Sequence, residues 1–197
     1  MVTRPKSRMP RSAAVSFQPH PKPAPHEPRN WKSTDAATAV KIFFALPPKT
    51  AARELMQELC TDDPYDHRCA AELARLVSRR KPGVLAAWAD LLAEVAAELP
   101  MEEWQARGYV LVAAVLNATT PAQRRRLLPL VRVRLAEDRI AVRAMALEAF
   151  ALLAAEEPDL RDEALALLEQ QRHSRDFALR ARARLMLPVL MRPKGTK

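Results

Sequence analysis

The chain has 197 residues, 49% of them hydrophobic, which is enough for one folded domain with its own core. It has only three Gly and seven Phe plus Tyr, while the helix formers Ala, Leu, Arg and Glu dominate, so the composition favours an all-α fold over a sheet. Two Cys are too few for a disulfide framework, and no apolar run approaches the ~20 residues that span a bilayer. We therefore expect a cytoplasmic protein with no membrane partner.

The charge is distributed unevenly along the chain, whose formal net charge is +9. Residues 1–33 contain seven Lys or Arg and a single acid, Glu27, and residues 192–197 add three more Lys or Arg. The 22 Lys and Arg of residues 34–191 are balanced by 22 Asp and Glu. A basic surface over the whole protein, as in many nucleic-acid-binding proteins, is therefore not expected.

The first 33 residues contain seven Pro among the basic residues. Because proline lacks a backbone N–H and blocks helix formation, we expect an extended, solvated arm here. A mitochondrial transit peptide, the alternative, is also basic and poor in acids, but these prolines would interrupt the amphipathic helix that it needs. The expected organisation is an arm at 1–33, a helical domain at 34–191 and a basic tail at 192–197.

From Thr34 onward, helical runs alternate with short breaks. Ser33 or Thr34 is suited to cap a first helix that extends through about Leu46, ahead of Pro47. Proline also lies just inside many later helix starts, where its missing N–H costs nothing. Further helices are expected at about 50–60, 65–80, 83–98, 101–117, 121–136, 139–156, 159–171 and 175–190. The short connections between them are typical of antiparallel, stacked helices.

Every second helix carries an arginine near its start. These arginines are 39, 36 and 37 residues apart, at Arg68, Arg107, Arg143 and Arg180. An acid precedes the first three by five residues, at Asp63, Glu102 and Asp138. The regular spacing indicates repeated helix pairs. We interpret each acid as a helix cap and each Arg as a bridge between neighbouring pairs, because several equivalent catalytic sites are not expected in one short chain.

Residues 138–153, Asp-Arg-Ile-Ala-Val-Arg-Ala-Met-Ala-Leu-Glu-Ala-Phe-Ala-Leu-Leu, have an acid in the turn followed by Val-Arg and small residues. This segment resembles the turn and second helix of a HEAT repeat, and residues 62–76 resemble the pattern more loosely. The resemblance to the HEAT-like α-helical repeat superfamily covers residues 49–190. It implies a right-handed α-α superhelix (a solenoid) with about four helix pairs plus an N-terminal helix.

A solenoid of this kind presents a groove built from its second helices, and such grooves bind peptides or partner proteins. We therefore expect a non-enzymatic scaffold or adaptor whose partner is a protein or peptide. The candidate partner-binding residues are Arg75, Arg107, Tyr109 and Arg143. No Gly-rich phosphate loop, nucleophile elbow or zinc signature occurs, so no catalytic residue, cofactor site or metal site is expected.

The alternative is a nucleic-acid-associated protein that neutralises phosphates with its arm and with Arg-rich helix faces. Three basic runs support it: Arg79-Arg80-Lys81, Arg124-Arg125-Arg126 with Arg132 and Arg134, and Arg180, Arg182 and Arg184. Against it stand the neutral charge of residues 34–191 and the scarcity of aromatic side chains for stacking on bases. The sequence therefore favours a protein partner.

Overall fold

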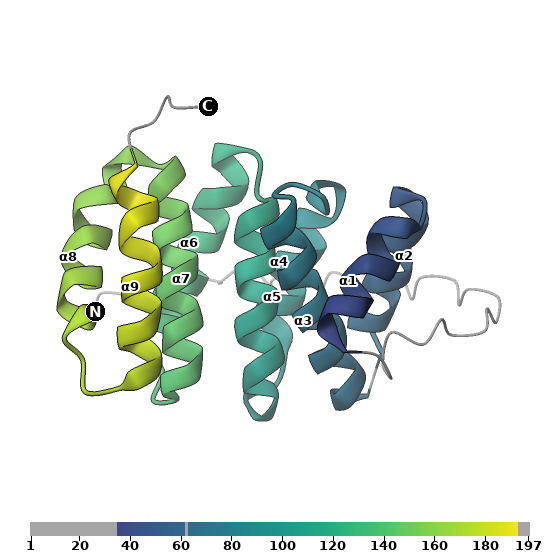
Figure 1. The fold of residues 1–197 in the computed structure, drawn as a ribbon, viewed down its shortest axis with the longest axis horizontal. Coiled ribbons are helices and arrows are strands. Elements are labelled where there is room, and N and C mark those ends of the chain that lie inside the picture. The colour runs from purple at the N-terminus through teal and green to yellow at the C-terminus, as the bar shows by residue number, and fades with distance from the viewer. Residues whose placement is uncertain (1–34, 62, 193–197) are drawn as a thin grey trace, which may run out of the picture.

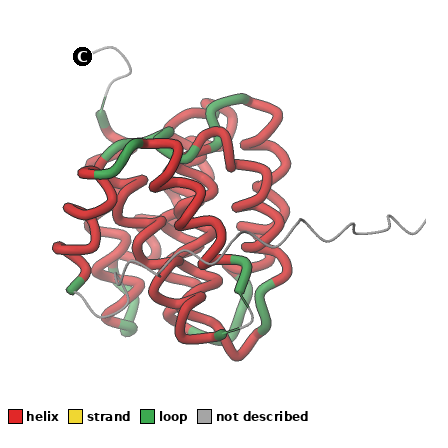
Figure 2. The backbone as a smooth tube through the Cα atoms, turned by 90° about the vertical axis from the view of Figure 1, so that its right-hand side faces the viewer, coloured by secondary structure: helices red, strands yellow, loops and turns green. Residues whose placement is uncertain are grey.

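The computed structural model describes residues 35–61 and 63–192, so the expected arm at 1–33 and the tail beyond Arg192 lie outside the described residues. The described part folds into the helices α1 (Ala36–Ala45), α2 (Pro48–Leu59), α3 (Pro64–Arg80), α4 (Ala89–Glu98), α5 (Trp104–Asn117), α6 (Pro121–Leu135), α7 (Ile140–Glu156), α8 (Arg161–Arg172) and α9 (Phe177–Met191). Single 3-10 turns precede α4, α5 and α8, at Ala86–Trp88, Met101–Glu103 and Pro158–Leu160. The predicted all-α fold is confirmed for this part of the chain, which contains no strand (Figure 2).

Most helices begin where the local sequence predicts. A proline occupies the first position of α2, α3 and α6, where no hydrogen bond is lost. Asp63 caps α3 as expected, because its carboxylate accepts two first-turn N–H groups at 2.8 and 3.2 Å. The cap predicted for α1 is wrong: Asp35, rather than Ser33 or Thr34, accepts the N–H groups of the first turn at 3.0 and 3.1 Å.

The largest local difference from the predicted helices is at α4, which begins at Ala89 instead of residue 83. Gly83 has a φ of 78°, a left-handed conformation that interrupts a helix. The N–H of Leu85 is then taken by the side-chain oxygen of buried Asn117, at 2.7 Å. Asn117 also donates to Ser78 at 2.7 Å, so one amide side chain joins α3, α5 and the turn before α4.

The helices pack in pairs along a row (Figure 1). α3, α5, α7 and α9 contact one another in that order, and each packs against the helix that precedes it in the chain. We call these four the second helices. α1 packs on α2 and α3 at one end of the row. In the described part, the loops lie at the two ends of the helices, which leaves the long sides of the second helices to carry a surface (Figure 2).

The core between the helices consists mainly of alanine and leucine. α5 and α7 lie between other second helices, so they are buried around most of their circumference. The side chain of Met145 on α7 packs closely against Gly108 on α5, where an added Cβ would lie 2.9 Å from Cγ of Met145. Small residues therefore set the spacing of the row, while each fully buried leucine contributes about 1.5–3 kcal/mol to folding.

Candidate partner-binding site

Successive second helices are joined near their N-terminal ends by contacts between a His or Arg side chain and a carboxylate. The pairs are His67–Glu103, Arg107–Glu137 and Arg143–Asp176, with N···O distances of 2.6, 2.9 and 3.6 Å. The predicted bridging role of the repeated arginines is thus confirmed at Arg107 and Arg143. In the first pair His67 has this role, while the neighbouring Arg68 lies over the ring of Tyr65, 5.3 Å from its centroid.

The prediction that Arg107 contacts a partner conflicts with its burial. Its side chain is only 4% exposed, and Nη2 donates to Oε1 of Glu137. Arg134 donates to the same oxygen at 2.6 Å. A guanidinium enclosed in this way connects α5 to the turn before α7 and does not reach the molecular surface.

Arg143 also lies apart from the other predicted contacts. It lines a cavity of about 190 Å³ together with Leu147, Leu179 and residues of α6 and α8. The predicted capping of α7 by Asp138 is wrong, because the residue at the cap position is Arg139 and makes no side-chain capping bond. The reason lies in the position of the acid: Asp138 precedes the cap position by one residue, whereas Asp63 occupies it.

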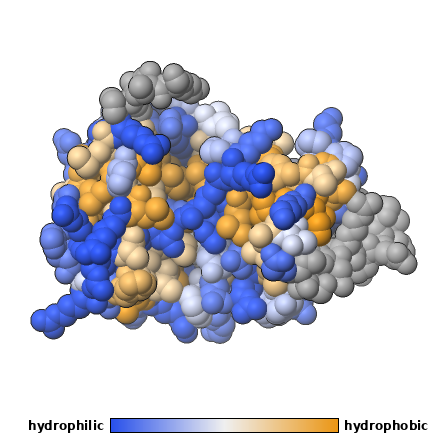
Figure 3. Space-filling model, viewed as in Figure 1, coloured by the Kyte–Doolittle hydropathy of each residue, from blue (hydrophilic) through white to orange (hydrophobic). Residues whose placement is uncertain are grey.

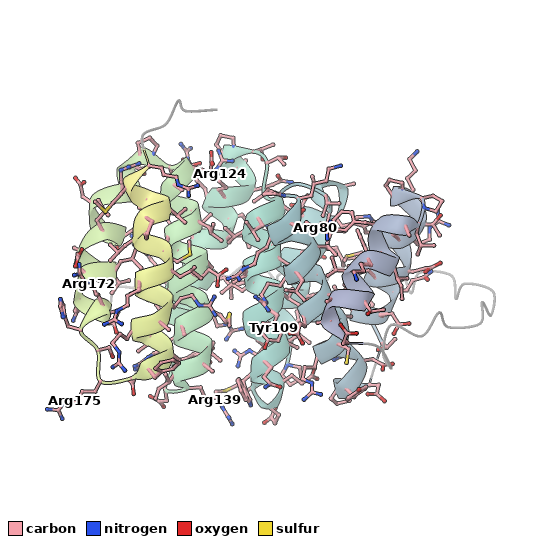
Figure 4. All side chains as sticks on the ribbon, in the orientation of Figure 1. Arg80, Tyr109, Arg124, Arg139, Arg172 and Arg175 are labelled. Atoms are coloured by element: carbon pink, nitrogen blue, oxygen red, sulfur yellow. The ribbon has the colours of Figure 1, made fainter. Side chains whose placement is uncertain are left out.

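The two remaining predicted contacts, Arg75 and Tyr109, lie together. Cζ of Arg75 is 4.7 Å from the centroid of the Tyr109 ring, a cation–π distance. Figure 4 labels Tyr109 on α5, in the middle of the row of helices. Arg79 of α3, Glu148 of α7 and Arg182 of α9 complete a network around this pair. We call these five residues the arginine cluster, which includes a side chain from each second helix.

Glu148 is the centre of the arginine cluster and is only 1% exposed. Arg79 donates to its Oε1 through Nη2 and, at 2.8 Å, through Nε. Arg182 donates to its Oε2 through Nη1 at 2.6 Å. Both carboxylate oxygens therefore accept charge-assisted hydrogen bonds, which tie α3 and α9 to α7.

The cluster has more positive than negative charge. Burial lowers the pKa of Arg75, the charge of Arg79 lowers it further, and Glu148 opposes both effects. Burial likewise lowers the pKa of Arg182, against the effect of Glu148. Glu72 adds one carboxylate at the rim, 3.8 Å from Arg75 and 43% exposed. Three guanidinium groups thus face two carboxylates, and an additional anion would be attracted.

Sequence reasoning missed Glu148, although one signal was present. It is the only charged residue between Arg143 and Glu156 in α7, whose neighbouring positions are alanine, leucine and phenylalanine. An acid on such a helix needs a cationic partner if it is buried. In the sequence, Arg79 and Arg182 belong to basic runs, and nothing local shows that both reach the same carboxylate.

Each second helix also carries a partly buried apolar side chain one turn or two from its member of the arginine cluster. We call these four residues the apolar row: Leu76, Leu116, Leu152 and Val189. Leu116 follows Tyr109, and Val189 follows Arg182, by seven residues, so each pair shares a helix face. In Figure 3, this side of the molecule shows hydrophobic surface on both sides of a hydrophilic band. Cluster and apolar row together form what we call the second-helix face.

The basic run on α6 is occupied by contacts with acids. The pairs are Arg124–Glu157, Arg126–Asp90, Arg126–Glu94, Arg132–Glu163 and Arg134–Glu137. Arg124, labelled in Figure 4, is 2.6 Å from its partner. Because acids neutralise four of the five arginines in this run, it does not form a free stripe for phosphates.

The described residues hold few other features that suggest chemistry. They contain no group of three His, Cys, Asp or Glu placed to hold a metal ion. No described helix is long and apolar enough to cross a membrane. A second cavity, of about 270 Å³, lies between the N-terminal ends of α3 and α5, where Tyr65, Arg68 and Trp104 line it.

Comparisons of the chain with protein-family models, with curated proteins and with solved structures found no match. The proposals below therefore depend on the geometry of the second-helix face.

Proposed function

We propose that the chain is a HEAT-like α-solenoid that serves as a non-enzymatic, protein-binding scaffold, and that its partner binds the second-helix face. The observation that carries this proposal is the combination of the arginine cluster with the apolar row on four adjacent helices. Tyr, Arg and Met are among the residue types that are enriched in protein interfaces, and such interfaces typically combine apolar and polar surface. Met145 lies beside Arg182, with its sulfur 3.8 Å from Nη2.

A site-specific photo-crosslinking experiment tests which face binds. Leu185 on α9 is 53% exposed and lies three residues after Arg182, on the same helix face. Val133 on α6 is 60% exposed and provides a matched position away from the second helices. We expect a photoreactive amino acid at 185, in the full chain in cells, to capture a discrete protein that the 133 variant does not capture. Equal capture at both positions would contradict the proposal.

The nucleic-acid alternative depends on the arm, because the α6 arginines are paired with acids. Its test is titration of the full chain with mixed DNA and RNA, beside a variant in which the seven basic residues of 1–33 are glutamine. Phosphate contacts make affinity fall steeply with salt, by a logarithmic slope of about 0.7–0.9 per contact. Submicromolar binding near physiological salt that the variant loses would favour this alternative over a scaffold.

A further inference from the structure

Arg75 is the least satisfied cation of the second-helix face. Its side chain is 11% exposed, and its Nε is buried without a hydrogen-bond partner. The closest acid, Glu72, lies 3.8 Å from Nη2, which is too far for a hydrogen bond. A guanidinium has five N–H donors, and leaving a buried donor unpaired costs stability. Such a residue calls for a specific explanation.

Within the arginine cluster, both oxygens of Glu148 accept hydrogen bonds from arginines other than Arg75. Oε1 of Glu148 is taken by Arg79, and Oε2 by Arg182. Tyr109 holds the guanidinium by its ring face at 4.7 Å, which orients the group without accepting its N–H bonds. Arg75 is therefore a cation fixed in position, next to two other guanidinium groups that are 33% and 18% exposed.

We propose that the arginine cluster binds a side-chain carboxylate of the partner, from an Asp or Glu adjacent to apolar residues. The acid occupies the exposed side of Arg75 and Arg79, and the apolar residues contact Leu116 and Leu152 of the apolar row. This inference rests on the proposed function and specifies its partner as an acidic, amphipathic segment. Carboxylates match the planar guanidinium, which can donate two parallel hydrogen bonds.

A partner carboxylate fits better than a nucleic-acid phosphate. Bound nucleic acid gains much of its affinity from bases stacked on aromatic side chains, and a ring face of Tyr109 is covered by Arg75. Residues 34–191 carry equal numbers of acids and bases, so the domain provides no long-range attraction for a polyanion. The adjoining apolar row suits aliphatic side chains instead.

The test begins with random 12-residue peptides displayed on phage, selected against the full chain. We expect selected peptides to share an Asp or Glu beside Leu, Ile, Val or Phe. Synthetic copies with amidated C termini then bind through side chains alone. Replacing the peptide acid by its amide, or Arg75→Gln in the protein, should each weaken binding about tenfold or more. Combining both changes should weaken it little further, because the two groups interact directly.

The matched control is Arg132→Gln, which removes an exposed arginine from α6 and should leave peptide affinity unchanged. Arg75→Gln should keep the melting temperature or raise it, because the substitution removes a buried Nε that has no hydrogen-bond partner. A melting temperature several degrees lower would identify Arg75 as a structural residue and overturn the proposal.

The remaining outcomes separate this inference from the proposed function. Selected peptides that crosslink at position 185 but bind Arg75→Gln as tightly as the native chain would overturn the carboxylate site and leave the scaffold standing. Failure of both peptide selection and crosslinking at 185 would overturn the scaffold as well. Single-stranded DNA that binds the native chain and is lost with Arg75→Gln would show that the cluster binds phosphate instead.

Discussion

The second-helix face and the outer helices α6 and α8 both carry arginines, but the exposed arginines of the outer helices are paired differently from those of the face. On the outer helices, Arg126 and Arg132 pair with exposed acids, and both partners in each pair are more than half exposed. On the second-helix face, Arg79 and Arg182 share one buried carboxylate, and Arg75 has no hydrogen-bonded acid. The number of arginines therefore does not indicate which region binds a partner, whereas their burial and their pairing with acids do.

Of the substitutions that distinguish the two regions, we expect Glu148→Ala to cause the largest loss in the free energy of unfolding. Removing one partner of a buried ion pair leaves uncompensated charges and costs about 3–5 kcal/mol. The outer counterpart, Glu163→Ala, should cost less than about 1 kcal/mol, since solvent already screens that pair. Urea unfolding of both full-length variants, followed by circular dichroism, measures the difference. Similar losses for the two would remove the distinction between the regions.

Close packing of the second helices predicts a smaller effect for Gly108→Ala. Helix propensity favours alanine by about 0.8–1 kcal/mol, whereas overpacking against Met145 costs about 1–3 kcal/mol. We expect a net loss of about 0–2 kcal/mol in the free energy of unfolding. Met145→Ala should reduce the cost of the Gly108 substitution in a double-mutant cycle. Equal costs in both backgrounds would show that the two residues do not limit the approach of α5 and α7.

A substitution near the N-terminal end of a second helix, Arg143→Ala, should lower the free energy of unfolding by a smaller amount. Arg143 and Asp176 lie 3.6 Å apart, with side chains 34% and 38% exposed. We expect Arg143→Ala to lower the free energy of unfolding by about 0–1 kcal/mol, as for other exposed pairs. The same thermal or urea measurement checks this value. A loss above about 2 kcal/mol would mean that this pair belongs with the buried contacts.

The smallest effect is expected on the outer surface. Arg132→Gln should change the free energy of unfolding by less than about 0.5 kcal/mol, and the change should shrink further in 1 M salt. Unfolding at two salt concentrations tests both parts of this prediction. A larger loss that persists in salt would place Arg132 among the residues that hold the fold together.

The sequence was sufficient for the helices because their signals are local. Proline at first positions, the Asp63 cap and the apolar spacing act within a few residues, and they placed most helix ends correctly. The late start of α4 escaped prediction because Asn117, 32 residues away, takes the N–H of Leu85. Local signals contain no information about such a partner.

The candidate site depends far more on tertiary structure. Arg75 and Tyr109 could be selected from the sequence, because both residue types belong to second helices and to protein interfaces. Arg107 could not be excluded until the fold enclosed it against Glu137, 30 residues away. Arg79 and Glu148 are 69 residues apart, and only the packing of α3, α5 and α7 brings them into contact. Composition and the regular spacing of the arginines thus determined that the chain is helical. Which arginines remain available to a partner depends on the burial of charge, and that burial arises only when the helices pack.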